Sequence, residues 1–382
     1  MSGKRDKVLK LLLAIVLASV VVLLAAEGVA RLVAPPQPPL YVSHPLLGPS
    51  LAPNTVIERL SIDEPPVVFK LEMNPLGFRG KRMKETAKPK GAYRIFFLGA
   101  STVENILLPE ERTFPGRVDD ALAERVKGAP PVEVANTGVA GTGLEYSIGM
   151  LVNRVLPLEP DLCIFLHGHN AFFDSMREKW DPKAPPLPAP APQFKDWLAG
   201  SSRLVALLEA RKRARNSRED NKRWWYEGHR RERQVQFEKD GSKYTAPRFD
   251  VKRGIPHFKQ QLHRLALLAR DAGAVCAFMT QPVLYKDGTS AEEEAALQGV
   301  HIDGQNLDTP TLKYAMDAFN EAIRQVCREE GAILIDAAAE VPRDLQHFVD
   351  DVHLTSKGNE AVASSVLRAI LGAKNELPRP AR

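Results

Sequence analysis

At 382 residues, the chain is long enough for one large α/β domain with additions or for two smaller domains. Apolar residues make up 44% of it and charged residues 26%, a globular balance that excludes disorder throughout the chain. The formal net charge is +5, and the excess is confined to residues 203–233, which carry 11 basic and 5 acidic side chains.

The N-terminus predicts a membrane segment. The first ten residues carry four basic side chains, and an uncharged apolar run then extends to Ala26. Counted from Val8, this run (residues 8–26) approaches the roughly 20 residues that a bilayer requires. The positive flank precedes the run, which places the N-terminus in the cytoplasm and the rest of the chain on the far side.

We therefore predict an uncleaved, single-pass anchor in the inner membrane over residues 1–34. A cleaved signal peptide is the alternative, although no clean small-x-small site precedes Glu27. Both interpretations export the body of the chain, which in a bacterium means the periplasm.

Residues 35–92 predict a linker and a small β-rich lead-in. The linker contains the stiff stretch APPQPP, and short alternating runs such as VVFKLEM then separate turns such as NPLGFRG. We expect the lead-in to pack beside a main domain over residues 93–375.

From Tyr93 onward, strand-like apolar runs alternate with helical stretches. The expected strands are 93–99, 132–138, 161–168, 274–282 and 332–337, and the expected helices are 115–127, 143–156, 256–272, 310–329 and 357–372. This alternation predicts a three-layer α/β/α domain with a parallel sheet of about five strands. Active sites of such sheets lie at the carboxyl ends of the strands.

Polar residues and one glycine follow four of the five expected strands. Ser101 follows the first, Gly141 the second, Asn170 the third, and Asp350 with His353 the fifth. Because carboxyl ends of parallel strands meet at one edge, we expect these five residues to converge there.

The types of these residues suit nucleophilic catalysis. A serine hydroxyl attacks poorly until an imidazole takes its proton, and a carboxylate fixes the tautomer of that imidazole. We assign Ser101 as nucleophile, His353 as base and Asp350 as the orienting acid, because the D-x-x-H spacing puts acid and base in one turn. Asp351 is the alternative acid.

A tetrahedral intermediate also needs hydrogen-bond donors for its oxyanion. The backbone N–H groups of Gly141 and Ser101 and the side-chain amide of Asn170 are the candidates. Three donors of this kind make a complete oxyanion hole.

Four sequence blocks resemble those of the SGNH hydrolase, or GDSL-like, family in the correct order. They are GAS with Ser101, NTGVAG with Gly141, GHN with Asn170 and DDVHLT with His353. NPLGFRG is similar to the lead-in of anchored bacterial members. The resemblance implies a flavodoxin-like sheet and an enzyme that cleaves or transfers acyl groups through a serine intermediate.

The chain departs from this family pattern at three positions. Ala100 stands where many members have the aspartate of GDS, which is not the acid of the triad. Val103 and Glu104 replace the small residues that often follow the serine. These changes concern the shape of the pocket more than the mechanism.

Other interpretations of the same residues are structural. Ser101 alone would be a helix N-cap, and His353 alone a surface histidine beside the cap of the last helix. GVAGTG has the wrong glycine spacing for a dinucleotide site, and His167 and His169 lack further metal ligands nearby. The three cysteines, Cys163, Cys276 and Cys327, suit a core, so we expect no metal and no cofactor.

Residues 171–255 predict an insertion between the third and fourth strands. It begins with a proline-rich spacer and continues into the basic stretch 203–233, which contains the aromatic run Trp224 to Tyr226. Rooted after Asn170, it is a candidate lid that binds an anionic polymer, sugar rings or lipid headgroups. A solvated helical hairpin is the simpler interpretation, and export argues against a nucleic-acid partner.

The function that these observations predict is hydrolysis of acyl esters at the cell envelope through an acyl-enzyme, with an acylated glycan or lipid as the substrate class. One alternative is an O-acyltransferase that modifies an envelope polysaccharide. Another is a degenerate member that binds carbohydrate without chemistry.

Overall fold

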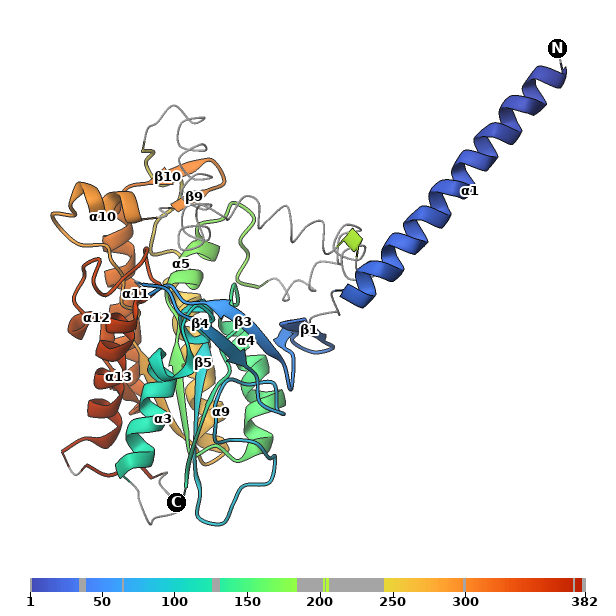
Figure 1. The fold of residues 1–382 in the computed structure, drawn as a ribbon. Coiled ribbons are helices and arrows are strands. Elements are labelled where there is room, and N and C mark those ends of the chain that lie inside the picture. Colours follow the sequence, from blue (N-terminus) through green and yellow to red (C-terminus); the bar gives the residue numbers. More distant parts are fainter. Residues whose placement is uncertain are drawn as a thin grey trace. The chain divides into compact units, whose positions relative to one another are not determined.

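The computed structural model describes residues 2–33, 39–63, 65–125, 131–183, 202, 204–205, 244–297, 300–373 and 375–379. These residues form two compact units (Figure 1). The first consists of residues 2–33 with 202 and 204–205, and the second contains the remaining described residues.

The first unit is dominated by one long helix, α1 (Ser2–Val33). Its segment Lys10–Val33 is 24 residues long and apolar enough to cross a membrane. Glu27 lies near the end of this helix, where it pairs with Arg31 and accepts hydrogen bonds from Ser202 and from the backbone of Leu204.

The second unit begins with two antiparallel hairpins, which confirm the β-rich lead-in. β1 (Tyr41–His44) pairs with β2 (Gly48–Leu51), and β3 (Val56–Leu60) pairs with β4 (Val68–Glu72). On β4, Phe69 and Leu71 are buried and alternate with exposed residues. They pack with Leu51, Met73 and Val139, which joins the lead-in to the main domain.

A five-stranded parallel sheet forms the centre of the main domain. Its strands are β5 (Tyr93–Gly99), β6 (Val132–Asn136), β7 (Leu162–Leu166), β8 (Val275–Met279) and β11 (Ile333–Ile335). They lie in the order β11-β8-β7-β5-β6, and every pairing is parallel. With the five strands numbered in chain order and read from β6 to β11, this is the flavodoxin-like order 2-1-3-4-5, with its switch point between β5 and β7.

Four of these strands end on the same row of the sheet. Gly99 of β5 is in register with Leu166 of β7, which is in register with Met279 of β8 and through it with Ile335 of β11. The third, fourth and fifth strands therefore end before the bounds expected from their apolar runs, because pairing stops at this shared row.

Helices cover both faces of the sheet. They are α3 (Phe114–Arg125), α4 (Leu144–Met150), α9 (Ile255–Asp271), α11 (Thr309–Glu330) and α13 (Ser356–Leu371). α3 packs against α13 on one face, whereas α9 packs against both α4 and α11 on the other (Figure 1). Each lies within a few residues of an expected helix, and the three-layer architecture is confirmed.

Shorter elements complete the described part of the chain. They are α2 (Ser101–Glu104), η1 (Glu110–Arg112), η2 (Leu151–Val155), η3 (Leu156–Leu158), α5 (His169–Ser175), α10 (Ala291–Ala296), β9 (Val300–Ile302), β10 (Gln305–Leu307) and α12 (Ala337–Glu340). The expected helix 143–156 is thus α4 continued by the π-helical turn η2. All three cysteines are buried and free.

The expected insertion begins on a helix, because residues 171–175 belong to α5. Most of the basic stretch 203–233, including Trp224 and Tyr226, lies outside the described residues.

Arg94 connects the amino-terminal edge of the sheet to its surroundings. It lies on β5, is fully buried, and its Nε donates to Glu133 Oε2 on the adjacent β6 at 2.7 Å. Its remaining nitrogens donate to the backbone carbonyls of Glu85, Thr86, Ala87 and Leu158. One guanidinium therefore joins the end of the lead-in to two strands and a helix end.

Replacing this arginine should destabilise the fold strongly. Arg94→Leu leaves the Glu133 carboxylate buried without a counter-ion, which should lower the free energy of unfolding by about 3–5 kcal/mol. The control is Arg112→Ala, which removes a half-exposed arginine that pairs with Asp63 at 2.7 Å and should cost no more than about 1 kcal/mol. Urea unfolding of the detergent-solubilised chain measures both, and equal costs would contradict the role of Arg94.

Candidate active site

The serine lies where the first strand of the sheet turns into a short helix. β5 ends at Gly99, and Ala100 is the N-cap of α2, with its carbonyl accepting from the N–H groups of Val103 and Glu104. Ser101 is the first residue of this helix and not its N-cap. Its Oγ lies 2.9 Å from Nε2 of His353 instead.

The second sequence block, NTGVAG, contacts α2 through Asn136 and Gly138. The Asn136 amide donates to the carbonyl of Val103 at 2.6 Å and accepts from the N–H of Gly138 at 3.0 Å. A Cβ on Gly138 would lie only 2.4 Å from the Glu104 nitrogen, so only glycine allows this approach. Val103 is fully buried between these groups, so its departure from the family pattern affects the core and not the pocket.

The histidine and its acid belong to an irregular loop that follows α12. An antiparallel bridge between Phe348 and Leu354 closes this loop, and the Val349 N–H donates to the His353 carbonyl. Asp350 Oδ1 accepts from the N–H groups of Val352 and His353, while Oδ2 lies 2.8 Å from His353 Nδ1. The carboxylate therefore fixes both the turn and the imidazole ring.

The alternative acid makes a different contact. Asp351 Oδ2 accepts a hydrogen bond from the Tyr285 hydroxyl at 2.7 Å, and its carbonyl accepts from the N–H of Leu284. Asp350, and not Asp351, therefore meets Nδ1 of His353.

Burial and charge act in opposite directions on this pair. Burial disfavours the imidazolium, but the Asp350 carboxylate and its hydrogen bond outweigh that effect and raise the pKa of His353 above its ordinary value. Burial likewise opposes ionisation of Asp350, whose pKa is nevertheless lowered by His353 and by two backbone N–H donors. Asp350 is thus charged at neutral pH, and His353 gains basicity from it.

The expected oxyanion donors differ in how close they lie to the cavities beside Ser101. Asn170, in the first turn of α5, lines a small cavity together with Ser101, and its amide also donates to the Thr142 carbonyl at 2.8 Å. Gly141 lies in an exposed turn with φ of 73° and does not line the cavities described beside Ser101, whereas its neighbour Ala140 does. Among the described residues, the N–H groups of Ser101 and Gly141 donate no hydrogen bond to a backbone carbonyl.

A second cavity, of ≈ 60 Å³, also borders the serine. Ser101 and His353 line it together with Glu104 of α2 and Arg59 of β3. Sequence reasoning noted Glu104 only as a departure from the family pattern and did not single out Arg59. The one available signal was a charged residue at an inward position of β3, visible only once the hairpin register is known.

Glu104 is a buried carboxyl that connects three segments. It accepts hydrogen bonds from the Tyr41 hydroxyl at 2.5 Å and from the Ala140 N–H at 3.1 Å. Burial raises its pKa to about 7, against the lowering effect of these donors and of Arg79 and Arg59. The lead-in, α2 and the loop before Gly141 therefore meet at this side chain.

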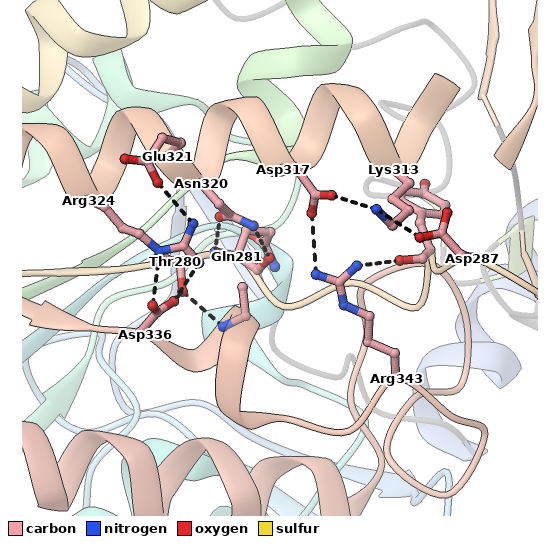
Figure 2. A network of polar contacts seen from close by, with 12 residues as sticks. Thr280, Gln281, Asp287, Lys313, Asp317, Asn320, Glu321, Arg324, Asp336 and Arg343 are labelled. Atoms are coloured by element: carbon pink, nitrogen blue, oxygen red, sulfur yellow. Dashed lines mark hydrogen bonds and ion pairs between the residues drawn. The ribbon is translucent and has the colours of Figure 1, made fainter. Parts of the chain in front are cut away.

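The segment that follows β8 is tied to α11 and to the end of β11 (Figure 2). The backbone of Gln281 exchanges two hydrogen bonds with the Asn320 amide, at 2.7 and 3.0 Å. Thr280 donates to Asp336, and Arg324 holds both carboxylate oxygens of the same aspartate. Gln281 also lines the small cavity beside Ser101, so this network shapes one wall of the site.

The same segment positions the loop that carries the acid and the histidine. Arg343 bridges from the Asp317 carboxylate to the backbone carbonyl of Tyr285, and Figure 2 shows its link to Asp317. The Tyr285 hydroxyl and the Leu284 N–H then bind Asp351. The loop is therefore fixed by contacts to Asp351 as well as by the contact of His353 with Ser101.

The two other histidines of this edge are bound within the fold. His167 Nε2 lies 2.7 Å from the Ser147 hydroxyl, and burial lowers the pKa of His167 to about 4. His169 stacks on Phe173 and lies near the Tyr285 hydroxyl. Among the described residues, no cluster of histidine, cysteine or acidic side chains has the arrangement of a metal site.

Solved structures with similar folds share little sequence with this chain. An alpha/beta hydrolase enzyme from the metagenome of Lake Arreo, Spain, is 12% identical with a TM-score of 0.41, over 72% of this chain and 94% of that one. An acetylxylan esterase from Geobacillus stearothermophilus is 13% identical with a TM-score of 0.39, over 72% and 93%. A putative GDSL-like lipase from Parabacteroides merdae is 12% identical with a TM-score of 0.41, over 72% and 94%.

No protein-family model and no curated protein matches the sequence. The structural likeness concerns the fold alone. For this chain, the order of strands in its own sheet carries the assignment of the fold.

The raised pKa of His353 predicts the pH dependence of serine reactivity. His353 must be neutral to accept the proton of Ser101, so labelling by a fluorophosphonate should be lost as pH falls through the pKa of His353. Because that pKa is raised, the midpoint should lie above the ordinary value of about 6.5. Intact mass after timed labelling gives the rate at each pH.

Asp350→Asn should move this midpoint to lower pH and reduce the plateau rate by roughly 10³- to 10⁴-fold. Asp344→Asn is the matched control, because Asp344 and His347 form the same D-x-x-H contact, at 2.7 Å, on the same loop. An unchanged midpoint in Asp350→Asn would show that the carboxylate does not control the imidazole.

Proposed function

We propose that this chain is a serine-dependent esterase of the SGNH type, which hydrolyses carboxylic esters through an acyl-enzyme intermediate. The observation that carries the proposal is the continuous contact from Ser101 Oγ to His353 Nε2, at 2.9 Å, and from His353 Nδ1 to Asp350 Oδ2, at 2.8 Å. The names of the structural neighbours, an acetylxylan esterase and a putative GDSL-like lipase, point to the same reaction class.

The geometry supports an ordinary sequence of acyl-transfer steps. His353 Nε2 takes the proton of Ser101 while Oγ attacks the ester carbonyl, and Asp350 stabilises the imidazolium that forms. The imidazolium then protonates the leaving alcohol as the carbon–oxygen bond breaks. Water, activated by the neutral His353, attacks the acyl-enzyme and releases the carboxylic acid.

The oxyanion of each tetrahedral intermediate needs donors near Ser101. We assign the Ser101 N–H, which lies at the start of α2, together with the Asn170 amide and the Gly141 N–H. Asn170 lies at the same cavity as the serine, and its amide also donates to the carbonyl of Thr142, the residue after Gly141. Its amide nitrogen carries a second hydrogen, which is available to the oxyanion.

We place this reaction on the periplasmic side of the inner membrane. The support is the apolar helix α1, whose segment Lys10–Val33 suits a membrane span, together with the basic residues that precede it. The substrates would then be acyl esters of the cell envelope, such as an acylated glycan or lipid.

Loss of the serine hydroxyl should abolish both labelling and turnover. In the detergent-solubilised chain, the wild type should gain one fluorophosphonate adduct and release acid from short acyl esters, whereas Ser101→Ala should do neither. Ser147→Ala is the matched control, because Ser147 also contacts a histidine, His167, which makes no hydrogen bond to an acidic side chain among the described residues. That variant should keep the adduct.

The products of the same reaction distinguish the alternative fates of the acyl group. With oligosaccharide added, a hydrolase yields free acid, whereas an O-acyltransferase yields an acylated sugar. A folded wild-type protein that takes no label yet binds carbohydrate would overturn the proposal in favour of a binding module.

Removal of the anchor tests the location. The full chain should stay in the membrane fraction after alkaline carbonate extraction, and a chain lacking residues 1–34 should be soluble. In intact cells, an added protease should digest the body only after the outer membrane is permeabilised. Digestion that requires lysis of the inner membrane would place the body in the cytoplasm.

A further inference from the structure

A charged side chain occupies the inward face of the lead-in. Arg59 lies on β3 in register with Phe69 of β4, and Phe69 is buried. Glu58 and Lys70, the next pair of the hairpin, are exposed. Alternation along a strand places an apolar residue at the position of Arg59, so a guanidinium there needs a partner.

The cavity beside the serine is where this guanidinium lies. Arg59 lines it together with Ser101 and His353, and the remaining wall includes the apolar side chains of Ile62 and Leu107. Its volume of ≈ 60 Å³ exceeds the roughly 10–15 Å³ that a single water needs, so a few non-hydrogen atoms fit. A cation and an apolar wall thus face the same small space, beside the nucleophile.

One nitrogen of this guanidinium has no hydrogen-bond partner among the described residues. Arg59 Nε is buried and has no hydrogen-bond acceptor among them. Arg79, which comes from the same lead-in, is by contrast occupied by Glu110 and by the carbonyls of Glu104, Asn105 and Leu108.

Glu104 does not supply the missing contact. No hydrogen bond or ion pair joins it to Arg59 in the described structure, and its two oxygens accept from Tyr41 and Ala140. Its pKa of about 7 means that it is partly neutral at neutral pH, which also weakens its repulsion of an anion in the cavity.

We propose that Arg59 binds a carboxylate carried by the ester substrate, at the end of a short carbon chain that lies against the apolar wall of the Ser101 cavity. A planar guanidinium matches a carboxylate through paired hydrogen bonds, which a lysine cannot reproduce. This inference rests on the proposed esterase function and names the class of substrate: anionic esters in which the charge lies a few atoms from the scissile carbonyl.

Two isosteric pairs of esters test the inference and locate the charge. Monoethyl succinate and ethyl 4-methylpentanoate differ in the charge of the acyl side. Acetoxyacetate and isobutyl acetate differ in the charge of the alcohol side. For each pair, acid release in a pH-stat with the full chain in detergent gives the ratio of kcat/KM for the anionic ester to that for the neutral ester.

Arg59→Gln should lower this ratio about tenfold or more for one of the two pairs, mainly through KM, because a charge-assisted hydrogen bond is lost. Arg59→Lys should keep part of the preference. Lys70→Gln, which removes one positive charge from the exposed face of the same hairpin, should leave the ratio unchanged. The pair that responds identifies the side of the ester that carries the carboxylate.

The inference and the proposed function fail in different ways. If Ser101 is labelled and esters are cleaved, but Arg59→Gln changes neither ratio by more than about twofold, the assignment of Arg59 is wrong and the esterase remains. If the wild type neither takes label nor cleaves any ester, the proposed function is wrong.

Calorimetry on the Ser101→Ala chain then measures the binding of the esters directly and tests the role of Arg59 without turnover. Tighter binding of an anionic ester than of its neutral isostere, lost when Arg59→Gln is added, supports the anion site. Equal binding of the two esters, or a preference that survives Arg59→Gln, overturns it.

Discussion

The register of the parallel sheet is the constraint on which the site depends. Because Gly99, Leu166, Met279 and Ile335 lie on one row, the chain leaves β5, β7, β8 and β11 at the same level. Ser101 lies two residues beyond the end of β5, and Asn170 lies four residues beyond the end of the neighbouring β7. Backbone hydrogen bonds between the strands thus determine how close the serine and the amide come, before any side-chain contact is made.

The histidine reaches this edge by other means. It lies on neither a strand nor a helix, and its loop is closed by the bridge between Phe348 and Leu354. Asp350 is almost completely buried. One carboxylate oxygen accepts hydrogen bonds from the backbone of its own turn, and the other contacts the His353 ring. Tyr285 also holds the loop, through its hydrogen bond to Asp351. A buried carboxylate with several donors stays charged, which is the condition for a basic imidazole.

The lead-in contributes to the chemistry of the site as well as to its packing. Arg79 donates to backbone carbonyls at the end of α2, and the Tyr41 hydroxyl donates to the buried carboxyl of Glu104. Arg59 lines the cavity beside Ser101. A segment that precedes the α/β domain in the sequence thus forms one wall of the space next to Ser101. Under the proposed function, the reaction would take place at the sheet edge, and the hairpin would select among esters.

The periodicity of the sequence was sufficient to predict the secondary-structure elements and the fold class. Apolar runs of strand length alternated with amphipathic stretches. All five strands and the five helices that cover the sheet were therefore expected at nearly their observed places. The ends of the first strand were expected correctly, but the other four strands end earlier than expected, because an apolar run such as AVCAFMTQP continues past the residue where pairing stops. The four blocks likewise identified Ser101, Asn170 and His353 as neighbours, since residues after successive parallel strands must meet at one edge.

Only the tertiary structure decided which polar residues contact one another. D-x-x-H occurs twice in this loop, as Asp344 with His347 and as Asp350 with His353, and both pairs make the same contact between carboxylate and ring. Local spacing accounts for both contacts, but only the second histidine lies against a serine that is 252 positions away in the chain. The choice of Asp350 over Asp351, and the place of Arg59, depend in the same way on packing between distant segments. Spacing along the sequence specifies a turn, whereas contacts between distant segments are specified by the sheet register and the packing around it.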